Sequence, residues 1–151
     1  MTTATKVYSA ENIANYFIYL SSKIVGDNQE REGITNLKLQ KILYFAQAYF
    51  VAKVGKTLFK EKIEAWEYGP VVPVIYHKYK SHGNRPIVLE HDTSIISDID
   101  KKNLDKVWEN FGGYSARRLV DITHAHKPWK EASGEITIKS LVDYYSPLLN
   151  K

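Results

Sequence analysis

Apolar residues recur at steps of three and four along much of the chain, the spacing that places side chains on one face of an α-helix. The first such segment follows Ser9, a residue type that favours the position just before a helix. Tyr16, Tyr19 and Lys23 fall on its polar side, and we expect the helix to end at residues 26–28. Its apolar stripe consists of Ala10, Ile13, Phe17, Leu20 and Ile24.

A second helix is predicted from Thr35 or Asn36, as its N-cap, to about Lys53, with Gly55 ending it. Further apolar residues occupy nearly every other angle around this helix, which is typical of a helix buried at the centre of a domain. Its strongest apolar face consists of Leu39, Ile42, Leu43, Ala46 and Phe50.

One narrow strip of this second helix is polar but uncharged. Asn36, Gln40 and Gln47 align at steps of four and seven, with Tyr44 and Val51 beside them. Such a strip is either the polar edge of a buried helix or a surface that another chain covers, because the cores of protein interfaces are depleted in charge but tolerate polar atoms.

The middle of the chain contains the only signals for β-structure. Residues 63–68 alternate in polarity and predict a short strand, which we expect to form a hairpin with residues 87–89. Gly69-Pro70 is a turn signal, and Pro70 is predicted to be the first residue of a short helix that continues through Tyr79.

The last third of the chain is again helical in pattern. Helices are predicted after Ser97 or Asp98, after Ser115, and from about Thr137 to Tyr145, with a turn at Pro128. The apolar positions of the first of these helices are Ile99, Leu104, Val107, Trp108 and Phe111. The predicted fold is therefore mainly α: one compact helical domain over residues 1–151, built around a central buried helix, with one short β-hairpin.

Composition narrows the class of protein. With 151 residues, 44% of them hydrophobic and 25% charged, the chain matches an ordinary globular domain. No apolar run approaches the roughly 20 residues of a membrane-spanning helix, and the first residues lack the pattern of a signal peptide. The absence of cysteine excludes disulfides and thiol nucleophiles, and is compatible with a cytoplasmic protein.

No constellation of catalytic or metal-binding residues emerges from the sequence. His124 and His126 are two residues apart, a spacing that points to different faces of a helix, and no acidic residue completes a metal-binding motif. The turn at Gly112-Gly113 lacks the spacing of a phosphate-binding loop. We therefore predict no cofactor, no metal ion and no enzymatic activity.

The net charge of +4 is small, but residues 76–85 interleave tyrosines with positive charge. That pattern fits nucleic acid or an acidic surface on a partner protein. The chain also has 11 Tyr and 3 Trp, residue types that are enriched at protein interfaces. A nucleic-acid-binding regulator that uses residues 76–85 and Arg117-Arg118 is the weaker alternative, since no known nucleic-acid-binding motif accompanies them.

Two linked motifs carry a resemblance to a known family. Residues 39–49 read LQKILYFAQAY, Leu58-Phe59 follow, and residues 63–76 read IEAWEYGPVVPVIY. This combination resembles the Panacea domain of the GepA/SocA-like family of bacterial and phage proteins, with Ile42 where leucine is common. The match is close over residues 37–79, with weaker similarity extending to Pro128-Trp129 and the final helix.

The resemblance implies an antitoxin of a type II toxin–antitoxin pair that neutralises its toxin by direct protein binding, in a hetero-oligomer. Toxins paired with the family include small alarmone synthetase-like enzymes. The family has no catalytic residues that could be assigned to positions of this sequence. Some members have an additional N-terminal DNA-binding region, which we do not expect here because the helical pattern already starts at Ser9. An adaptor that delivers its bound partner to a protease would use the same surface.

We expect the partner-binding surface to lie beside the motif residues that form the core. Four candidates lie on the polar strip of the second helix, three are aromatic residues of the second motif, and three are basic residues near them. The predicted partner-binding residues are Asn36, Gln40, Tyr44, Gln47, Trp66, Tyr68, Tyr76, His77, Lys78 and Lys80.

Overall fold

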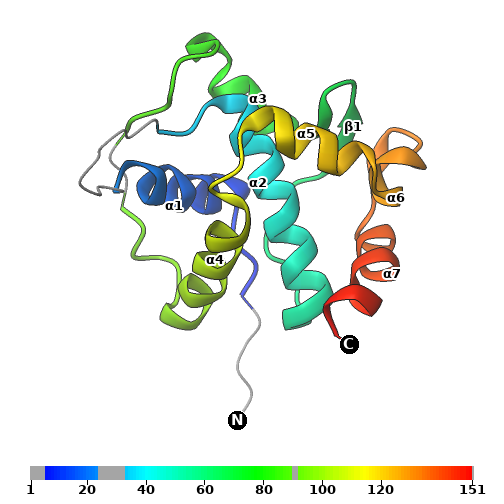
Figure 1. Cartoon of the computed structure of the whole chain (residues 1–151). Coiled ribbons are helices and arrows are strands. Elements are labelled where there is room, and N and C mark those ends of the chain that lie inside the picture. The colour runs from blue at the N-terminus through cyan, green and yellow to red at the C-terminus, as the bar shows by residue number, and fades with distance from the viewer. Residues whose placement is uncertain (1–5, 24–32, 90–91, 151) are drawn as a thin grey trace.

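The central element of the fold is helix α2 (Asn36–Tyr49), which is buried along nearly its whole length. A computed structural model describes residues 6–23, 33–89 and 92–150. Figure 1 shows α2 crossed by α1 (Ala10–Ser22) and flanked by α4 (Asp98–Phe111), with α5 (Ala116–His124) and α7 (Ile138–Leu149) packed on its remaining sides. The predicted mainly α fold around a central buried helix is confirmed.

Each of these five helices begins with a hydroxyl side chain. The hydroxyl accepts a hydrogen bond from the backbone N–H three residues further on, which satisfies one of the unpaired donors at a helix start. The capping residues are Ser9, Thr35, Ser97, Ser115 and Thr137. The starts of these five helices were therefore predicted to within one residue, whereas the expected end of α1 at residues 26–28 lies outside the described residues.

Helix α2 does not stop at Tyr49 but continues as the π-helical turn η1 (Phe50–Val54), on which α7 packs. Gly55 ends it with a φ of +91°, a left-handed conformation that glycine adopts without steric cost. The predicted extent to about Lys53 is confirmed, although the last turn is wider than an α-helix.

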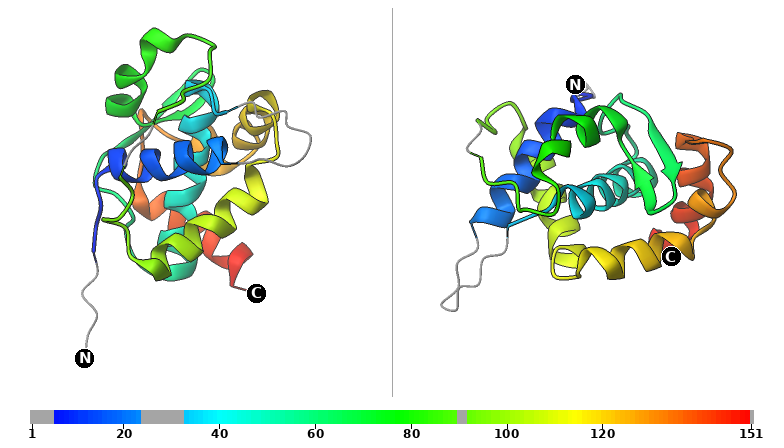
Figure 2. Two further views of the ribbon diagram at one scale, coloured as in Figure 1. Left: turned by 90° about the vertical axis from the view of Figure 1, so that its left-hand side faces the viewer. Right: turned by 90° about the horizontal axis from the view of Figure 1, so that it is seen from above.

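The sheet differs from the predicted hairpin. Strand β1 (Ile63–Trp66) pairs with β2 (Gly69–Val71) on one side and β3 (Glu135–Ile136) on the other, both antiparallel. The expected pairing with residues 87–89 is wrong, because Ile87 forms an isolated bridge with Ile34 instead. Figure 2 shows the hairpin lying beside α2.

Pro70 lies inside β2, not at the start of a helix. It stands opposite Ala65 at the edge of the sheet, where the missing N–H of proline removes no necessary hydrogen bond. Helix α3 (Pro73–Lys78) begins three residues later, with Pro73 in its first turn. The short elements η2 (Lys80–His82) and α6 (Lys127–Lys130) complete the described chain.

Two residues lie on the opposite face from the one predicted. Tyr16 is buried, and its hydroxyl donates a 2.6 Å hydrogen bond to Asp105 of α4. Ile99, predicted to be apolar core, is exposed in the first turn of α4. No described helix is long and apolar enough to cross a membrane.

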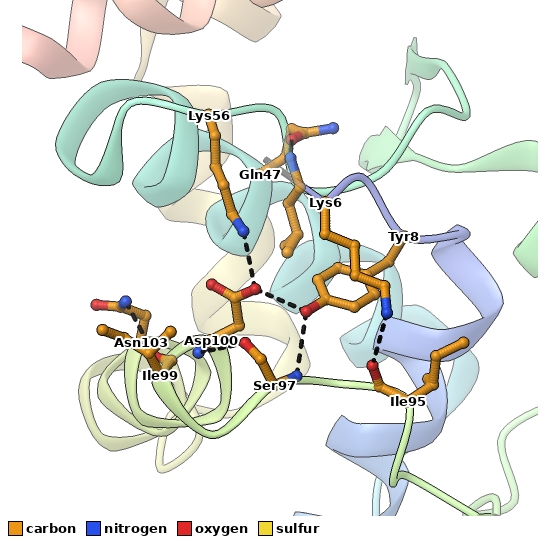
Figure 3. A network of polar contacts seen from close by, with 10 residues as sticks. Lys6, Tyr8, Gln47, Lys56, Ile95, Ser97, Ile99, Asp100 and Asn103 are labelled. Atoms are coloured by element: carbon orange, nitrogen blue, oxygen red, sulfur yellow. Dashed lines mark hydrogen bonds and ion pairs between the residues drawn. The ribbon is translucent and has the colours of Figure 1, made fainter. Parts of the chain in front are cut away.

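A buried polar network connects three distant parts of the chain (Figure 3). The Asp100 carboxylate accepts hydrogen bonds from the Tyr8 hydroxyl at 2.6 Å and from the Lys56 ammonium at 2.8 Å. The Tyr8 hydroxyl in turn accepts from the backbone N–H of Ser97 at 3.2 Å. Burial by itself would raise the pKa of Asp100, but the bonds from Lys56, Tyr8 and Ser97 outweigh it and hold the pKa below its ordinary value.

Replacing this carboxylate should destabilise the fold. Asp100→Asn leaves the Lys56 ammonium without its counter-charge, and we expect the free energy of unfolding to fall by about 2–3 kcal/mol. Since the pKa of Asp100 is lowered on folding, its contribution is present above pH 4 and is lost as the pH falls through the folded value. Urea unfolding at pH 7 measures the change, with Asp98→Asn on the exposed side of the same turn as the control. Equal losses in the two variants would contradict the assignment.

Candidate functional site

The predicted polar strip on α2 is almost completely covered by the rest of the chain. Asn36, Gln40, Tyr44 and Gln47 are all buried within the chain. As a polar edge of a buried helix, the three amides pair with backbone groups of the segments that follow α2, and Tyr44 pairs with the Tyr145 hydroxyl. Asn36 and Gln40 also line a surface pocket, so partner binding by these two residues stays a prediction.

The three amides hold backbone segments against α2. Gln47 accepts from the N–H of Leu58 at 2.8 Å and donates to the carbonyl of Phe59 at 2.9 Å. Gln40 accepts from the N–H of Val72 at 2.9 Å, and Asn36 donates to the carbonyl of Tyr76 at 3.1 Å. Because buried backbone groups need partners, these bonds fix where the hairpin and α3 lie relative to α2.

Tyr44 belongs to a buried chain of hydroxyls on the side of α2 that faces α7. Its Oη lies 2.9 Å from Oη of Tyr145, which lies 2.8 Å from Nδ1 of His126. Burial raises the pKa of both tyrosines and lowers the pKa of His126. These groups are internal, so Tyr44 contributes to packing α7 onto α2.

A surface pocket of about 430 Å³ opens where α2, the hairpin and the α3–η2 segment meet. Such a volume is within the usual range of ligand and side-chain binding pockets. Six of the ten predicted site residues line it, so the structure does bring them together. They are Asn36, Gln40, Trp66, Tyr68, Tyr76 and Lys80.

Aromatic side chains form the walls of this pocket. Trp66 and Tyr76 meet edge to face with their ring centroids 5.1 Å apart, and Tyr68 at the tip of the hairpin is 62% exposed. The Trp66 indole N–H donates to the carboxylate of Glu64 at 2.9 Å, which fixes the ring. The pocket therefore presents a rigid aromatic surface at its mouth.

Two residues that sequence reasoning did not assign to the site hold the tip of the hairpin. Trp129 Nε1 donates to the carbonyl of Trp66 at 2.8 Å, and His124 Nε2 lies 3.0 Å from the carbonyl of Glu67. The two rings stack with centroids 4.0 Å apart. The sequence does place His124 close to the Pro128-Trp129 turn. It does not show that these two side chains bond to the hairpin.

The remaining two predicted residues lie on α3 outside the pocket lining. Lys78 forms an ion pair with Glu11 of α1 at 3.2 Å, and the His77 ring lies 6.3 Å from Trp66 between centroids. In the basic segment 76–85, Arg85 donates to the carbonyls of Ser81 and His82. Among the described residues no group of three or more His, Cys, Asp or Glu could hold a metal ion.

Sequence reasoning missed the lysine that underlies the pocket. Lys41 is 0% exposed, and its ammonium donates to the carbonyl of Pro70 at 3.0 Å. No carboxylate in the described part of the chain forms an ion pair with it, and burial lowers its pKa to about 7. The signal was present, because Lys41 is a charged residue among apolar ones on a helix predicted to be buried on all sides.

Comparison with known proteins places this region within a family. The model of the family described as "Antitoxin SocA-like, Panacea domain" matches residues 39–130, from α2 to α6. A protein named Antitoxin SocA from Caulobacter vibrioides (strain NA1000 / CB15N) is 38% identical over 109 residues. The match covers 64% of this chain and 58% of that relative, so it spans less than two thirds of the relative's length. No solved structure matches significantly.

The buried lysine gives the fold a distinct pH dependence. The pKa of Lys41 falls from 10.5 to about 7 on folding, so between these values the unfolded chain binds more protons. Stability therefore rises with pH across this window. From pH 7 to pH 9 we expect the wild type to gain about 2 kcal/mol more than Lys41→Met, measured by urea unfolding. Parallel pH profiles for the two proteins would refute the assignment.

Gly69 is expected to tolerate no larger residue. Its φ is +106°, and a Cβ there would lie 2.8 Å from Cε of Lys41. Gly55 also has a positive φ, but open space surrounds it, so Gly55→Ala measures the conformational cost alone. Gly69→Ala should lower the unfolding free energy by about 1–2 kcal/mol more than Gly55→Ala. Equal losses in thermal unfolding would show that Lys41 does not pack against the turn.

Proposed function

Because the chain belongs to the Panacea-domain family of SocA-like antitoxins, we propose that it is the antitoxin of a type II pair and neutralises its toxin by direct protein binding. The observation that carries this proposal is the family match over residues 39–130, which contains the hairpin and most of the pocket lining. The relative named Antitoxin SocA supports the same role. The chain then acts by binding, without catalysing a reaction.

We place the toxin-binding surface around the mouth of the pocket. Tyr68 protrudes from the hairpin tip, and the apolar side chains of Leu37 and Val74 are exposed on α2 and α3. Tyrosine and tryptophan contribute much contact area at low conformational entropy cost, which suits them to interface centres. His77, Lys78 and Lys80 would contribute charged groups at the rim.

The proposed complex is a cytoplasmic hetero-oligomer, with residues 1–151 acting as one domain. The packing of α1 and α7 on α2 supports one domain, because these helices lie outside the matched region yet share its core. A small alarmone synthetase-like enzyme is the toxin class to test first, and the protein encoded by the adjacent gene is the first candidate.

Co-expression tests the function directly. The candidate toxin should arrest growth alone and be tolerated when this chain is produced with it, and the two should copurify. A candidate that is harmless alone, or that remains toxic beside this chain, contradicts the pairing. Toxin abundance separates neutralisation by binding, in which the toxin persists, from delivery to a protease, in which it disappears.

The hairpin tip provides the sharper prediction. Tyr68→Ala should weaken toxin binding by about tenfold or more, because it removes an exposed aromatic contact from the proposed centre of the interface. Tyr114→Ala, which removes a 39% exposed tyrosine from the loop before α5, should change the affinity less than about twofold. Calorimetric titration measures both. An unchanged affinity in Tyr68→Ala would exclude the hairpin tip from the interface.

A further inference from the structure

Two amide side chains, those of Asn36 and Gln40, line the pocket beside the hairpin. The Gln40 side-chain oxygen accepts from the N–H of Val72, and the Asn36 side-chain oxygen accepts from the Gln40 amide at 2.8 Å. One N–H group of the Asn36 amide donates a hydrogen bond to the carbonyl of Tyr76. Each side-chain amide carries two N–H donors, so one donor remains on each residue after these internal bonds are made.

Spare N–H donors favour a ligand that accepts hydrogen bonds, and nearby positive charge favours one that is also negatively charged. Two lysines line the pocket: Lys41 beneath the floor and Lys80 on the exposed rim. Glu67 is the acidic residue of the lining; it lies on the exposed hairpin tip, and Lys41 is bonded instead to the carbonyl of Pro70. A buried ammonium without a counter-charge is unfavourable, so an anion entering the pocket would gain more from it than from an exposed lysine.

We propose that this pocket receives a carboxylate side chain of the toxin, an aspartate or glutamate flanked by an apolar residue. The carboxylate would accept from the spare amide donors of Asn36 and Gln40 and from Lys80, above the Lys41 ammonium. The flanking residue would pack on Trp66 and Tyr76. This inference rests on the proposed function and adds to it the chemistry by which the toxin is recognised.

The walls favour a protein side chain over a free anion as the source of the carboxylate. The aromatic residues Trp66, Tyr68 and Tyr76 line the same pocket as the two amides, and a small free anion would leave these rings uncovered. The exposed side chains of Leu37 and Tyr68 continue the apolar surface out of the pocket mouth. A carboxylate carried on a protein surface covers the donors and the apolar rim at once.

A double-mutant cycle with the purified pair tests the proposal. Each surface aspartate and glutamate of the toxin is changed to its amide and titrated against wild type, Lys41→Met and Lys80→Met. We expect one toxin variant to bind the wild type about tenfold more weakly, but to lose less than about threefold against Lys41→Met. Lys62 precedes β1 at the end away from the hairpin tip and has an exposed side chain, so Lys62→Met should leave the affinity within about twofold.

The outcomes separate the two proposals. If wild-type chain and toxin form a complex but no toxin acid couples to Lys41 or Lys80, the carboxylate pocket is wrong while the antitoxin function stands. If the wild type neither binds nor neutralises any candidate toxin, the proposed function itself fails. Lys80→Met keeps the test decisive should Lys41→Met fold poorly, because Lys80 is exposed on the rim.

Proton uptake gives a second, independent readout. A carboxylate above Lys41 stabilises its charged form, so complex formation at pH 8 should take up close to one proton, measured by calorimetry in buffers of different ionisation enthalpy. The other titratable groups near Lys41 are Glu67 and Tyr68 on the hairpin, Tyr76, Lys80, and His124 of α5. Comparison with Lys41→Met removes their contribution, and equal uptake by both proteins would overturn the proposal.

Discussion

Three amide side chains on a single buried helix hold the hairpin, α3 and the segment before the hairpin against the core. Asn36, Gln40 and Gln47 use their oxygen and nitrogen atoms to pair with backbone groups of residues 58–59, 72 and 76. Water cannot replace these partners in the interior, so each bond is costly to lose. The hairpin and α3 are therefore held by polar bonds as well as by apolar packing, and the pocket between them has fixed walls.

The same arrangement buries a lysine that has no acidic partner among the described residues. Lys41 lies among the amides and beneath the turn at Gly69, where its ammonium has one carbonyl partner and a lowered pKa. An apolar residue of similar length would fill this position at less cost to stability. The lysine lies under the pocket that Trp66, Tyr68 and Tyr76 line, so its position matches the binding role proposed for that pocket.

Sequence reasoning predicted the helices well because their signals are local. Hydroxyl caps and apolar periodicity lie within a few residues of the elements they specify, as at Ser9 and Ser115. The strand pairing was wrong because β3 lies some 70 residues from β1, and two residues of strand carry no pattern of their own. The predicted residues that line the pocket came from three local signals: the polar strip of α2, the aromatic residues of the second motif and the basic residues after it. The burial of the strip depended on segments whose positions only the structure reveals.

Contacts between residues that are far apart in the sequence complete the core. The Tyr44 and Tyr145 hydroxyls are 101 positions apart, and Ile63 of β1 pairs with Ile136 of β3. During synthesis on the ribosome, the free edge of β1 must therefore wait for β3, and one face of α2 must wait for α7. Until these residues emerge, the nascent polypeptide exposes an unpaired strand edge and an apolar helix face, surfaces suited to capture by chaperones or to early engagement by a binding partner.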